Sequence, residues 1–418
     1  MEKQEVEKRK SVLIVGGGAG GMAAAIAAAR LGADVTILEK EDKPGRKLLA
    51  TGNGRCNLTN VDGTDKAYHG RERAFAENVL EGFSVQETRA FFRELGLYTT
   101  VENGRVYPYA GQAETVLHVL LRELSRLGVR IKCGEDVLAA SKLKNDPFFH
   151  IQTRTWEYTA NALVLACGTA ASLGKKQLPA NGYSLAASFG HSLVPTVPAL
   201  VPLKVAEAGK LAFAGVRIPG RVTVFADGAE LAADTGQLQL TENGISGIPV
   251  FNTSGLAARA LLAGKKVTAE LDFLPQLGEE ETAGLLRELG GGSGCLLDAR
   301  ETLRGLLPER LVRSIFRSFA GYEPSIEELA ERIKHFPLTV TGTAGEGHAQ
   351  VLSGGVPTSE VAADTLESRL VPGLFLVGEM LDIDGICGGY NLQFAWSTGI
   401  LAGRAAAMEN YLEGGCKR

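Results

Sequence analysis

The stretch that decides the fold lies near the N-terminus, where residues 11–21 read Ser-Val-Leu-Ile-Val-Gly-Gly-Gly-Ala-Gly-Gly. Ser11 to Val15 is rich in valine and isoleucine, which predicts a strand buried on both faces of a parallel sheet. Glycines at positions 16, 18 and 21 follow the pattern Gly-x-Gly-x-x-Gly, and the alanine-rich stretch from Met22 to Arg30 predicts a helix. The order of strand, glycine turn and helix predicts the first half of a Rossmann unit.

Each glycine of the pattern has a physical task. Gly16 permits the sharp turn, Gly18 lets a pyrophosphate approach the backbone, and Gly21 lets helix and strand pack closely. The unpaired N–H groups and positive dipole of the helix N-terminus then stabilise the phosphates without a lysine. The alternative is a glycine-rich helix–strand junction without a ligand.

A second predicted strand, Asp34 to Leu38, ends in Glu39, at the distance from the turn where a ribose-binding acid is expected. Its carboxylate should accept hydrogen bonds from ribose hydroxyls and repel a 2′-phosphate. The sequence therefore predicts an adenosine nucleotide of the FAD or NAD type.

The segment from Lys40 to Asn60 is dense in glycine, asparagine and arginine. This composition predicts a loop outside the core, whose backbone donors and guanidinium groups hold phosphates or the edge of a flavin. An ordinary solvated loop is the alternative. A later predicted strand, Ala162 to Ala166, ends in Cys167-Gly168-Thr169, small residues that let the backbone pass close to a cofactor or pack against a helix.

The C-terminal region contains a predicted strand from Leu374 to Val377, then Gly378-Glu379, then Gly388-Gly389-Tyr390-Asn391-Leu392-Gln393. A helix is expected after Gln393, with a face of small residues at Ala395, Gly399, Ala402, Gly403 and Ala405. Its N-terminus would offer N–H groups and a positive dipole to the negative charge at the flavin N1 and O2 edge. The alternative is a plain buried helix with a glycine-rich cap.

Taken together, residues 15–21, 45–60, 342–356 and 378–403 resemble the bacterial aminoacetone oxidase-like family of flavoproteins, which includes a dehydro-bile-acid reductase. The resemblance extends over nearly the whole chain. It implies a non-covalently bound FAD between the N-terminal Rossmann half and the C-terminal helix, with a two-part insert between them. It also implies that Glu379 contacts the ribityl chain and that the backbone of Val137 meets the adenine.

The same resemblance places Asn391, Leu392 and Gln393 beside the flavin ring. The two lines of argument give one set of expected FAD contacts: Gly16, Gly17, Gly18, Ala19, Gly20, Gly21, Glu39, Lys40, Gly45, Arg46, Lys47, Gly52, Asn53, Gly54, Arg55, Cys56, Asn57, Val137, Ala166, Cys167, Gly168, Gly378, Glu379, Asp382, Gly389, Tyr390, Asn391, Leu392 and Gln393.

The middle of the chain changes character. Short β-rich runs such as Arg221 to Phe225 and Lys266 to Leu271 predict a small antiparallel barrel, and helical patterns such as Leu311 to Phe319 predict a helical subdomain. The glycine run at 290–294 is interpreted as a flexible joint, since no strand precedes it. The expected fold is α/β, with a discontinuous Rossmann-type FAD domain (1–194 and 337–418), a barrel (195–275 and about 335–345) and a helical subdomain (276–334).

Composition limits the partners. The chain has 418 residues and a formal net charge of −4, which argues against a nucleic-acid partner. Six widely separated cysteines fit free thiols in a reducing compartment and give no metal site. The charged segment Met1 to Lys10 lacks the apolar core of a signal peptide, and the apolar stretch from Val12 to Leu31 is read as strand, turn and helix. A cytoplasmic protein without a membrane span is expected, with its oligomeric state left open.

A bound flavin supplies hydride chemistry itself, so few catalytic side chains are needed. Acid, base or hydrogen-bonding candidates near the expected ring are Cys56, Asn57, His348, Asp382, Asp384, Cys387 and Tyr390. His348 also fits a solvated loop histidine. Cys56 and Cys387 fit either a redox pair across the ring or two inert small residues.

The expected function is an FAD-dependent oxidoreductase that moves a hydride between a small organic substrate and NAD(P)H or oxygen. The resemblance implies that this substrate is an enone such as a dehydro-steroid or dehydro-bile acid. One alternative is an amine oxidase of the aminoacetone type. The other is a flavin-binding regulatory or scaffold protein without turnover.

Overall fold

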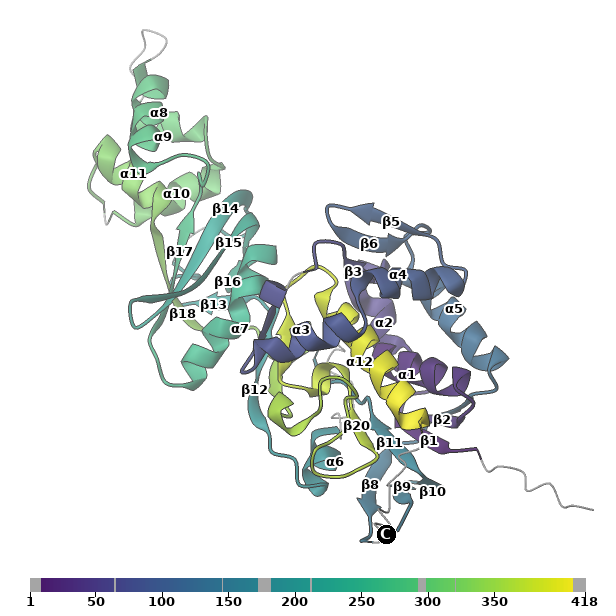
Figure 1. Ribbon diagram of the computed structural model, residues 1–418. Coiled ribbons are helices and arrows are strands. Elements are labelled where there is room, and N and C mark those ends of the chain that lie inside the picture. The colour runs from purple at the N-terminus through teal and green to yellow at the C-terminus, as the bar shows by residue number, and fades with distance from the viewer. Residues whose placement is uncertain are drawn as a thin grey trace, which may run out of the picture. The chain divides into compact units, whose positions relative to one another are not determined.

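The computed structural model describes residues 9–63, 65–144, 146–171, 182–210, 213–291, 298–319 and 321–408. The chain divides into two compact units, Met1–Thr196 with Ser353–Arg418, and Val197–Leu352 (Figure 1). The N-terminal tail before residue 9, most of the expected joint at 290–294, and Cys295 and Cys416 lie outside the described residues.

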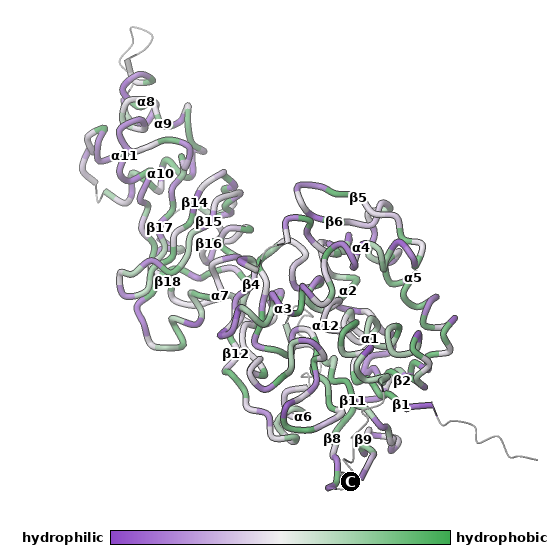
Figure 2. The backbone as a smooth tube through the Cα atoms, viewed as in Figure 1, coloured by the Kyte–Doolittle hydropathy of each residue, from purple (hydrophilic) through white to green (hydrophobic). Residues whose placement is uncertain are grey.

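The first unit is built on a five-stranded parallel sheet of order β20-β11-β1-β2-β7. Its strands are β1 (Ser11–Val15), β2 (Asp34–Glu39), β7 (Arg130–Cys133), β11 (Ala162–Leu165) and β20 (Leu374–Leu376). β1 lies in the centre, with Val15 opposite Leu38 of β2 and Leu165 of β11. Strands β1 and β11 are therefore buried aliphatic runs, as Figure 2 shows in green.

This strand order identifies where a ligand fits. The chain adds strands on one side of β1 with β2 and β7, and on the other side with β11 and β20. In an open parallel sheet, ligands bind at the carboxyl ends of the strands where the order reverses, which here is between β1 and β11. The main helices of the unit are α1 (Ala19–Arg30), α5 (Ala113–Arg126) and α12 (Tyr390–Ala407).

Smaller elements complete the first unit. Two three-stranded antiparallel sheets consist of β8 (Val137–Lys142), β9 (Phe149–Thr153) and β10 (Glu157–Ala160), and of β3 (Thr59–Asn60), β5 (Thr99–Glu102) and β6 (Arg105–Pro108). β4 (Tyr68–Gly70) pairs with β21 (Ile383–Gly385). The remaining helices are α2 (Arg46–Ala50), α3 (Arg73–Gly82), α4 (Val85–Glu94) and α6 (Gly182–Ser188), with short 3-10 turns such as η1 (Thr51–Gly54), η4 (Thr358–Glu360) and η5 (Gly378–Met380).

The second unit contains a closed antiparallel barrel of order β13-β16-β15-β14-β17-β18. Its strands are β13 (Leu203–Val205), β14 (Arg217–Ala226), β15 (Ala229–Leu240), β16 (Gly244–Ser246), β17 (Val267–Asp272) and β18 (Phe336–Thr343). Helix α7 (Ile248–Leu262) follows β16, and α8 (Glu279–Gly291), α9 (Ala299–Arg304), α10 (Glu309–Arg317) and α11 (Ile326–Lys334) lie between β17 and β18 in the sequence. The predicted fold class, a Rossmann-type unit with an inserted antiparallel barrel and helices, is confirmed.

Two strands carry the chain between the units. β12 (Val194–Ala199) leads out of the first unit and β19 (Val351–Gly355) leads back into it, and the two strands pair with each other. Among the described residues, no helix is both long and apolar enough to cross a membrane.

Two local predictions are wrong. The sequence predicts residues 56–60 in a loop outside the core, but they are buried, because β3 pairs with β6 and the indole of Trp396 on α12 donates to the carbonyl of Leu58 at 3.0 Å. The C-terminal helix begins at Tyr390 rather than after Gln393, because Gly389 adopts a left-handed conformation that turns the chain directly into it.

Candidate functional site

Of the three glycines in the Gly-x-Gly-x-x-Gly pattern between β1 and α1, two occupy crowded positions and one an open position. Gly16 has a φ of +110°, and a Cβ atom there would lie 2.3 Å from the carbonyl oxygen of Ala166. A Cβ atom on Gly21 would lie 2.0 Å from the carbonyl oxygen of Gly16. A Cβ atom on Gly18 would meet nothing within 4 Å, although its φ of −81° suits any residue. The fold requires glycine at 16 and 21, and leaves space beside Gly18.

The start of α1 suits an anion. Gly18 is the N-cap of the helix, and no side chain caps the N–H groups of the first turn. The first turn also contains no acidic residue that would compete with a phosphate. The space beside Gly18 and these N–H groups together fit a pyrophosphate.

Glu39, at the end of β2, is turned toward the glycine turn. Its Oε2 accepts a hydrogen bond from the amide of Gly17 at 2.8 Å, and its Oε1 accepts one from the amide of Glu41 at 3.0 Å. A carboxylate has about four acceptor sites, so it can still accept ribose hydroxyls. The backbone amide of Glu135 donates to the Glu39 carbonyl at 2.9 Å, which brings the start of β8 at Val137 close to the same end of the site.

The segment after β11 lies beside the glycine turn. The thiol of Cys167 donates to the carbonyl of Val15 at 3.6 Å, and Ala166 contacts Gly16 as described above. Gly168 has a φ of +63° with open space where a side chain would be. Burial raises the pKa of the Cys167 thiol to about 12, so it remains protonated and packs as a small neutral group.

Glu379 joins three segments that are far apart in the sequence. Its Oε2 accepts a hydrogen bond from Lys47 of α2 at 2.5 Å and one from the hydroxyl of Thr169 at 3.1 Å. Glu379 belongs to η5, directly after β20. The pairing holds Lys47, a second expected contact, beside Glu379.

The start of α12 packs against the buried part of the 51–60 segment. The side-chain amide of Asn60 donates to the carbonyl of Gly388 at 3.1 Å, and a Cβ atom on Gly389 would lie 2.8 Å from the carbonyl oxygen of Thr59. Helix α12 also packs closely on α1, since a Cβ atom on Gly399 would lie 2.4 Å from the carbonyl oxygen of Gly20. Stretches from near both ends of the chain therefore converge on one region of the first unit.

Two of the side chains expected beside a flavin ring form hydrogen bonds with other residues of the chain. Asn391 accepts from the amide of Gly385 at 2.8 Å and donates to the carbonyl of the same residue at 2.7 Å. The Gln393 side chain is buried and donates to Thr88 and Ser397 at 2.9 and 2.8 Å. No described side chain caps the first turn of α12, whose backbone carries the positive end of the helix dipole.

Buried oxygen atoms support the placement of a ligand nearby. Among the described residues, no partner is found for Asn57 Oδ1 or Thr59 Oγ1, which lie on the segment facing Gly389. Buried polar atoms are normally hydrogen-bonded, so an ordered water molecule or a polar ligand is expected to satisfy these two oxygens.

The other candidate residues have varied surroundings. Cys56 is fully buried, and burial raises the pKa of its thiol to about 12, which does not favour a redox role. Arg55 and Arg46 point outward, where Arg55 pairs with Glu102 at 2.6 Å and Arg46 with Glu41 at 2.8 Å. Cys387 is half-buried and not in a disulfide. His348 is exposed and belongs to the second unit.

One pair of polar residues in the first unit is not indicated by any sequence pattern. His69 of β4 lies opposite Asp384 of β21 in the antiparallel ladder. Asp384 is a candidate on its own, whereas His69 belongs to no glycine motif. Only the strand register shows that the two face each other.

Known proteins resemble this chain over most of its length. The model of the HI0933-like protein Rossmann domain matches residues 10–405. A 3-dehydro-bile acid delta(4,6)-reductase of Clostridium scindens is 44% identical over 94% of this chain and 98% of the relative. A ribosomal RNA dihydrouridine synthase of Haemophilus influenzae is 30% identical over 92% of this chain and 96% of the relative.

A solved structure shares the fold. The 3-ketosteroid delta1-dehydrogenase of Sterolibacterium denitrificans superposes with a TM-score of 0.51 at 13% identity, covering 95% of this chain and 99% of that one.

Proposed function

Because this chain belongs to the HI0933-like family of Rossmann-domain proteins, we propose that it binds FAD in its first unit and reduces a carbon–carbon double bond conjugated to a carbonyl group. The observation that supports this most is the convergence of three segments on one site. They are the open turn at Gly18, the Glu379 cluster and the first turn of α12. The resemblance and the enzyme class expected from the sequence, an FAD-dependent oxidoreductase, are confirmed by the relatives.

In this proposal the residues of the first unit hold FAD along its length. Gly18 and the N-terminus of α1 bind the pyrophosphate, Glu39 accepts the adenosine ribose hydroxyls, and the segment near Val137 meets the adenine. Glu379, with Lys47 and Thr169 fixed against it, contacts the ribityl chain. The backbone at the start of α12 faces the flavin ring. When bound, FAD supplies hydride transfer.

The substrate class follows from what the relatives' names have in common. Dihydrouridine is uridine whose ring double bond, conjugated to a carbonyl, has been saturated, and a delta(4,6)-reductase of a 3-dehydro bile acid saturates double bonds conjugated to the 3-keto group. Both reactions place a hydride and a proton across a conjugated double bond. We favour a steroid-sized ketone, since the 44% relative acts on one and the net charge of −4 disfavours RNA.

The electron donor in this proposal is NAD(P)H. The sequence contains a single strand-linked Gly-x-Gly-x-x-Gly turn, so a nicotinamide nucleotide would have to reach the same open face of the flavin as the substrate. Donor and substrate would then bind in turn rather than together.

The test is an anaerobic flavin assay. Purified protein should be yellow and release FAD on denaturation. NADH or NADPH should bleach the flavin, and 4-androstene-3,17-dione should restore its colour while aminoacetone does not. Bleaching by aminoacetone would instead identify an amine oxidase. No bleaching by any donor would favour a binding protein without turnover, and colourless protein that takes up no FAD would overturn the proposal.

A further inference from the structure

The hairpin of β5 and β6, at the margin of the first unit in Figure 1, carries aromatic side chains on one face. The amide of Tyr109 donates to the carbonyl of Tyr98 at 2.9 Å, so the strand pairing extends to these two residues. Side chains two residues apart on a strand point the same way, so Tyr109 lies on the face of Tyr107. The guanidinium of Arg55 lies 4.0 Å from the centroid of the Tyr107 ring and identifies this face.

Two of these rings are open to solvent. Tyr98 and Tyr109 are 73% and 71% exposed, the two highest values among the large hydrophobic side chains of the described residues. Their centroids lie 5.4 Å apart with the ring planes tilted by 59°, so each ring supports the other. In the part of the chain that the structure describes, no other two exposed aromatic side chains are in ring contact. Tyrosine rings offer a large stacking surface at a low cost in side-chain entropy, so this pair forms a platform for a planar group.

The same face carries a cation suited to a phosphate. Arg55 is 40% exposed, and its guanidinium is held by the Tyr107 ring and by an ion pair of 2.6 Å with Glu102. One of its five N–H donors binds Glu102, and arginine is the residue best shaped for phosphate oxygens. Tyr107 and Tyr109 are separated by about 7 Å along the strand. A platform and a cation at this spacing match the base and the phosphate of one nucleotide.

The hairpin adjoins the proposed flavin site through β3. A Cβ atom on Gly389, at the start of α12, would lie 2.8 Å from the carbonyl oxygen of Thr59 in β3. Thr59 pairs with Val106 of β6, and Tyr109 follows Val106 by three residues. With about 4.8 Å between strands and about 3.4 Å per residue, the tyrosine pair lies roughly 10–15 Å from Gly389. Two riboses and a pyrophosphate can span this distance.

We propose that Tyr98 and Tyr109 stack the adenine of the nicotinamide donor and that Arg55 binds its adenosine phosphate. This inference rests on the proposed function, in which NAD(P)H reduces the flavin. The nicotinamide end then reaches the flavin ring while the adenosine end is held on the hairpin. Such a site supplies the adenosine recognition for which other reductases use a second glycine turn, and the sequence has only one strand-linked turn of that pattern.

Two other occupants fit this face less well. In the proposed binding mode the adenosine of FAD lies at Glu39 and the segment near Val137, so the hairpin serves a second nucleotide. A single-stranded RNA would need a basic groove that follows its backbone. Arg55 is instead paired with Glu102, and the chain has a net charge of −4. The face therefore favours one short anionic ligand over a polyanion.

The first experiment measures the apparent Kd of the donor from anaerobic flavin bleaching in holoenzyme, with whichever of NADH and NADPH bleaches wild type. The double variant Tyr98→Ala/Tyr109→Ala should raise this Kd about 10-fold or more, because stacking on aromatic rings contributes strongly to the binding of a base. Its FAD content and limiting bleaching rate should not change. Tyr98→Phe/Tyr109→Phe keeps both rings and should bind the donor as wild type does. Trp156→Ala removes an exposed ring elsewhere in the first unit and is the matched control.

The second experiment replaces the donor with reduced nicotinamide mononucleotide, which lacks the adenosine phosphate. Wild type and Tyr98→Ala/Tyr109→Ala should then have the same apparent Kd. A loss of affinity for the mononucleotide equal to the loss for the full donor would overturn the placement of the adenine. With the full donor, Arg55→Gln should raise the apparent Kd, whereas Glu102→Gln removes the negative partner and should not raise it. An unchanged Kd in Arg55→Gln would overturn the assignment of the phosphate.

The outcomes separate this inference from the proposed function. Wild-type donor affinity in Tyr98→Ala/Tyr109→Ala would overturn the inference alone. If fluorescent oligouridine bound wild type and not this variant, while donor affinity was unchanged, the occupant would be a nucleic-acid strand and the inference would be wrong. A wild type whose flavin is bleached by dithionite but by neither NADH nor NADPH would overturn the proposed electron donor, and this inference with it.

Discussion

At Gly18 the backbone has an ordinary conformation and a side chain would meet only empty space, so the protein itself does not require glycine there. At Gly16 and Gly21 the opposite holds, since a Cβ atom would lie within 2.3 Å of a carbonyl oxygen at either position. The residues of one motif are thus glycine for different reasons. The proposed pyrophosphate would account for Gly18, and the fold accounts for Gly16 and Gly21.

Gly18→Val should give a folded protein that purifies without FAD, because the branched side chain would occupy the place proposed for the pyrophosphate. Flavin absorbance and circular dichroism measure the two properties separately. Gly21→Val is the comparison, and it should lower stability by several kcal/mol because the new side chain overlaps the Gly16 carbonyl. Full flavin content in folded Gly18→Val would show that the pyrophosphate does not bind beside Gly18.

Some residues of the site could be predicted from the sequence and others could not. Gly18 and Glu39 stand at fixed places in a local strand–turn–helix pattern, so spacing alone indicates them. The partners of Asn391 and Gln393 depend on tertiary packing, and neither Gly385 nor Thr88 is marked by any pattern. The pairing of His69 with Asp384 depends on strand register between segments more than 300 residues apart.

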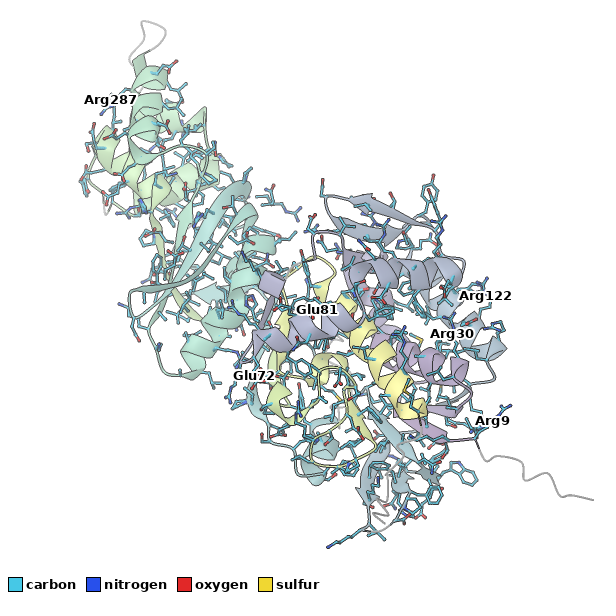
Figure 3. The ribbon with its side chains drawn as sticks, in the orientation of Figure 1. Arg9, Arg30, Glu72, Glu81, Arg122 and Arg287 are labelled. Carbon is cyan, nitrogen blue, oxygen red and sulfur yellow. The ribbon has the colours of Figure 1, made fainter. Side chains whose placement is uncertain are left out.

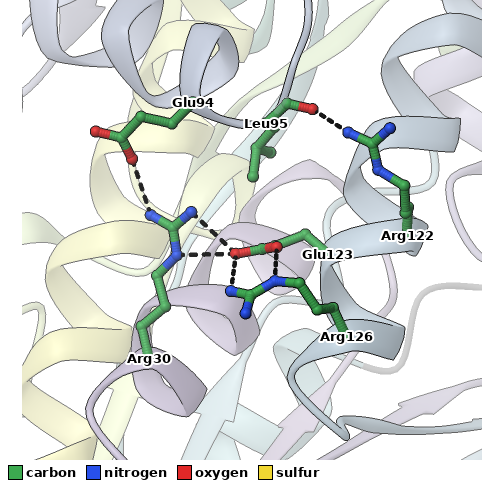
Figure 4. A network of polar contacts seen from close by, with 6 residues as sticks. All are labelled: Arg30, Glu94, Leu95, Arg122, Glu123 and Arg126. Carbon is green, nitrogen blue, oxygen red and sulfur yellow. Dashed lines mark hydrogen bonds and ion pairs between the residues drawn. The ribbon is translucent and has the colours of Figure 1, made fainter.

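Among the elements, α1 and α5 are joined by a network of charges (Figure 4). Glu123 of α5 lies 2.9 Å from Arg30 of α1 and 2.7 Å from Arg126 one turn further along α5. Arg30 also forms an ion pair with Glu94, and Arg122 donates a hydrogen bond to the carbonyl of Leu95. Figure 3 labels Arg30 and Arg122 among the side chains of this unit. The hydrogen bond from Arg126, followed by that from Arg30, lowers the pKa of Glu123 to about 2 despite its partial burial.

This network predicts a pH-dependent stability. A carboxylate whose pKa is depressed in the folded state contributes stability above its unfolded value of about 4.5, and loses it as the pH falls toward 2. Glu123→Gln should therefore cost on the order of 1–3 kcal/mol near neutral pH, and its difference from wild type should shrink below about pH 4. Urea unfolding at a series of pH values measures both effects.

Glu94→Gln is the matched control, because Glu94 is largely exposed and its pair with Arg30 is a surface contact. It should change the free energy of unfolding by less than about 1 kcal/mol at every pH. A constant difference between wild type and Glu123→Gln across the pH series would contradict the argument.

Helices α1 and α12 show how far element packing could be foreseen. The small residues at 395, 399, 402 and 403 predicted a close contact, and the structure gives it a partner, since a Cβ atom on Gly403 would lie 2.2 Å from the carbonyl oxygen of Ala24. The sequence shows that a helix has a narrow face, but not which helix it meets. The close contacts of Gly399 with Gly20 and of Gly403 with Ala24 identify that helix as α1.

For the whole molecule, every residue proposed to hold FAD belongs to the first unit, although these residues come from both ends of the chain. The chain leaves this unit in β12 and returns in β19, and the two strands pair, with Gly354 so close that a Cβ atom there would lie 2.7 Å from the carbonyl oxygen of Pro195. The ends of the intervening segment are therefore neighbours.

Replacing residues 200–350 with a short glycine–serine linker should leave a folded first unit that retains FAD. Flavin absorbance and thermal unfolding measure the two outcomes. The same shortened protein carrying Gly18→Val is the control and should be colourless. A shortened protein that folds but binds no FAD, even when FAD is added, would show that residues 200–350 take part in holding the cofactor.

The pairing of β12 with β19 also bears on the history of this chain. A segment whose two ends emerge on adjacent strands can be exchanged, enlarged or trimmed by recombination without rerouting any strand of the parallel sheet. Residues 10–196 and 353–405 would then share one evolutionary history, and residues 197–352 would have a different one. Evolutionary trees drawn from the two parts separately would branch differently wherever such an exchange had taken place.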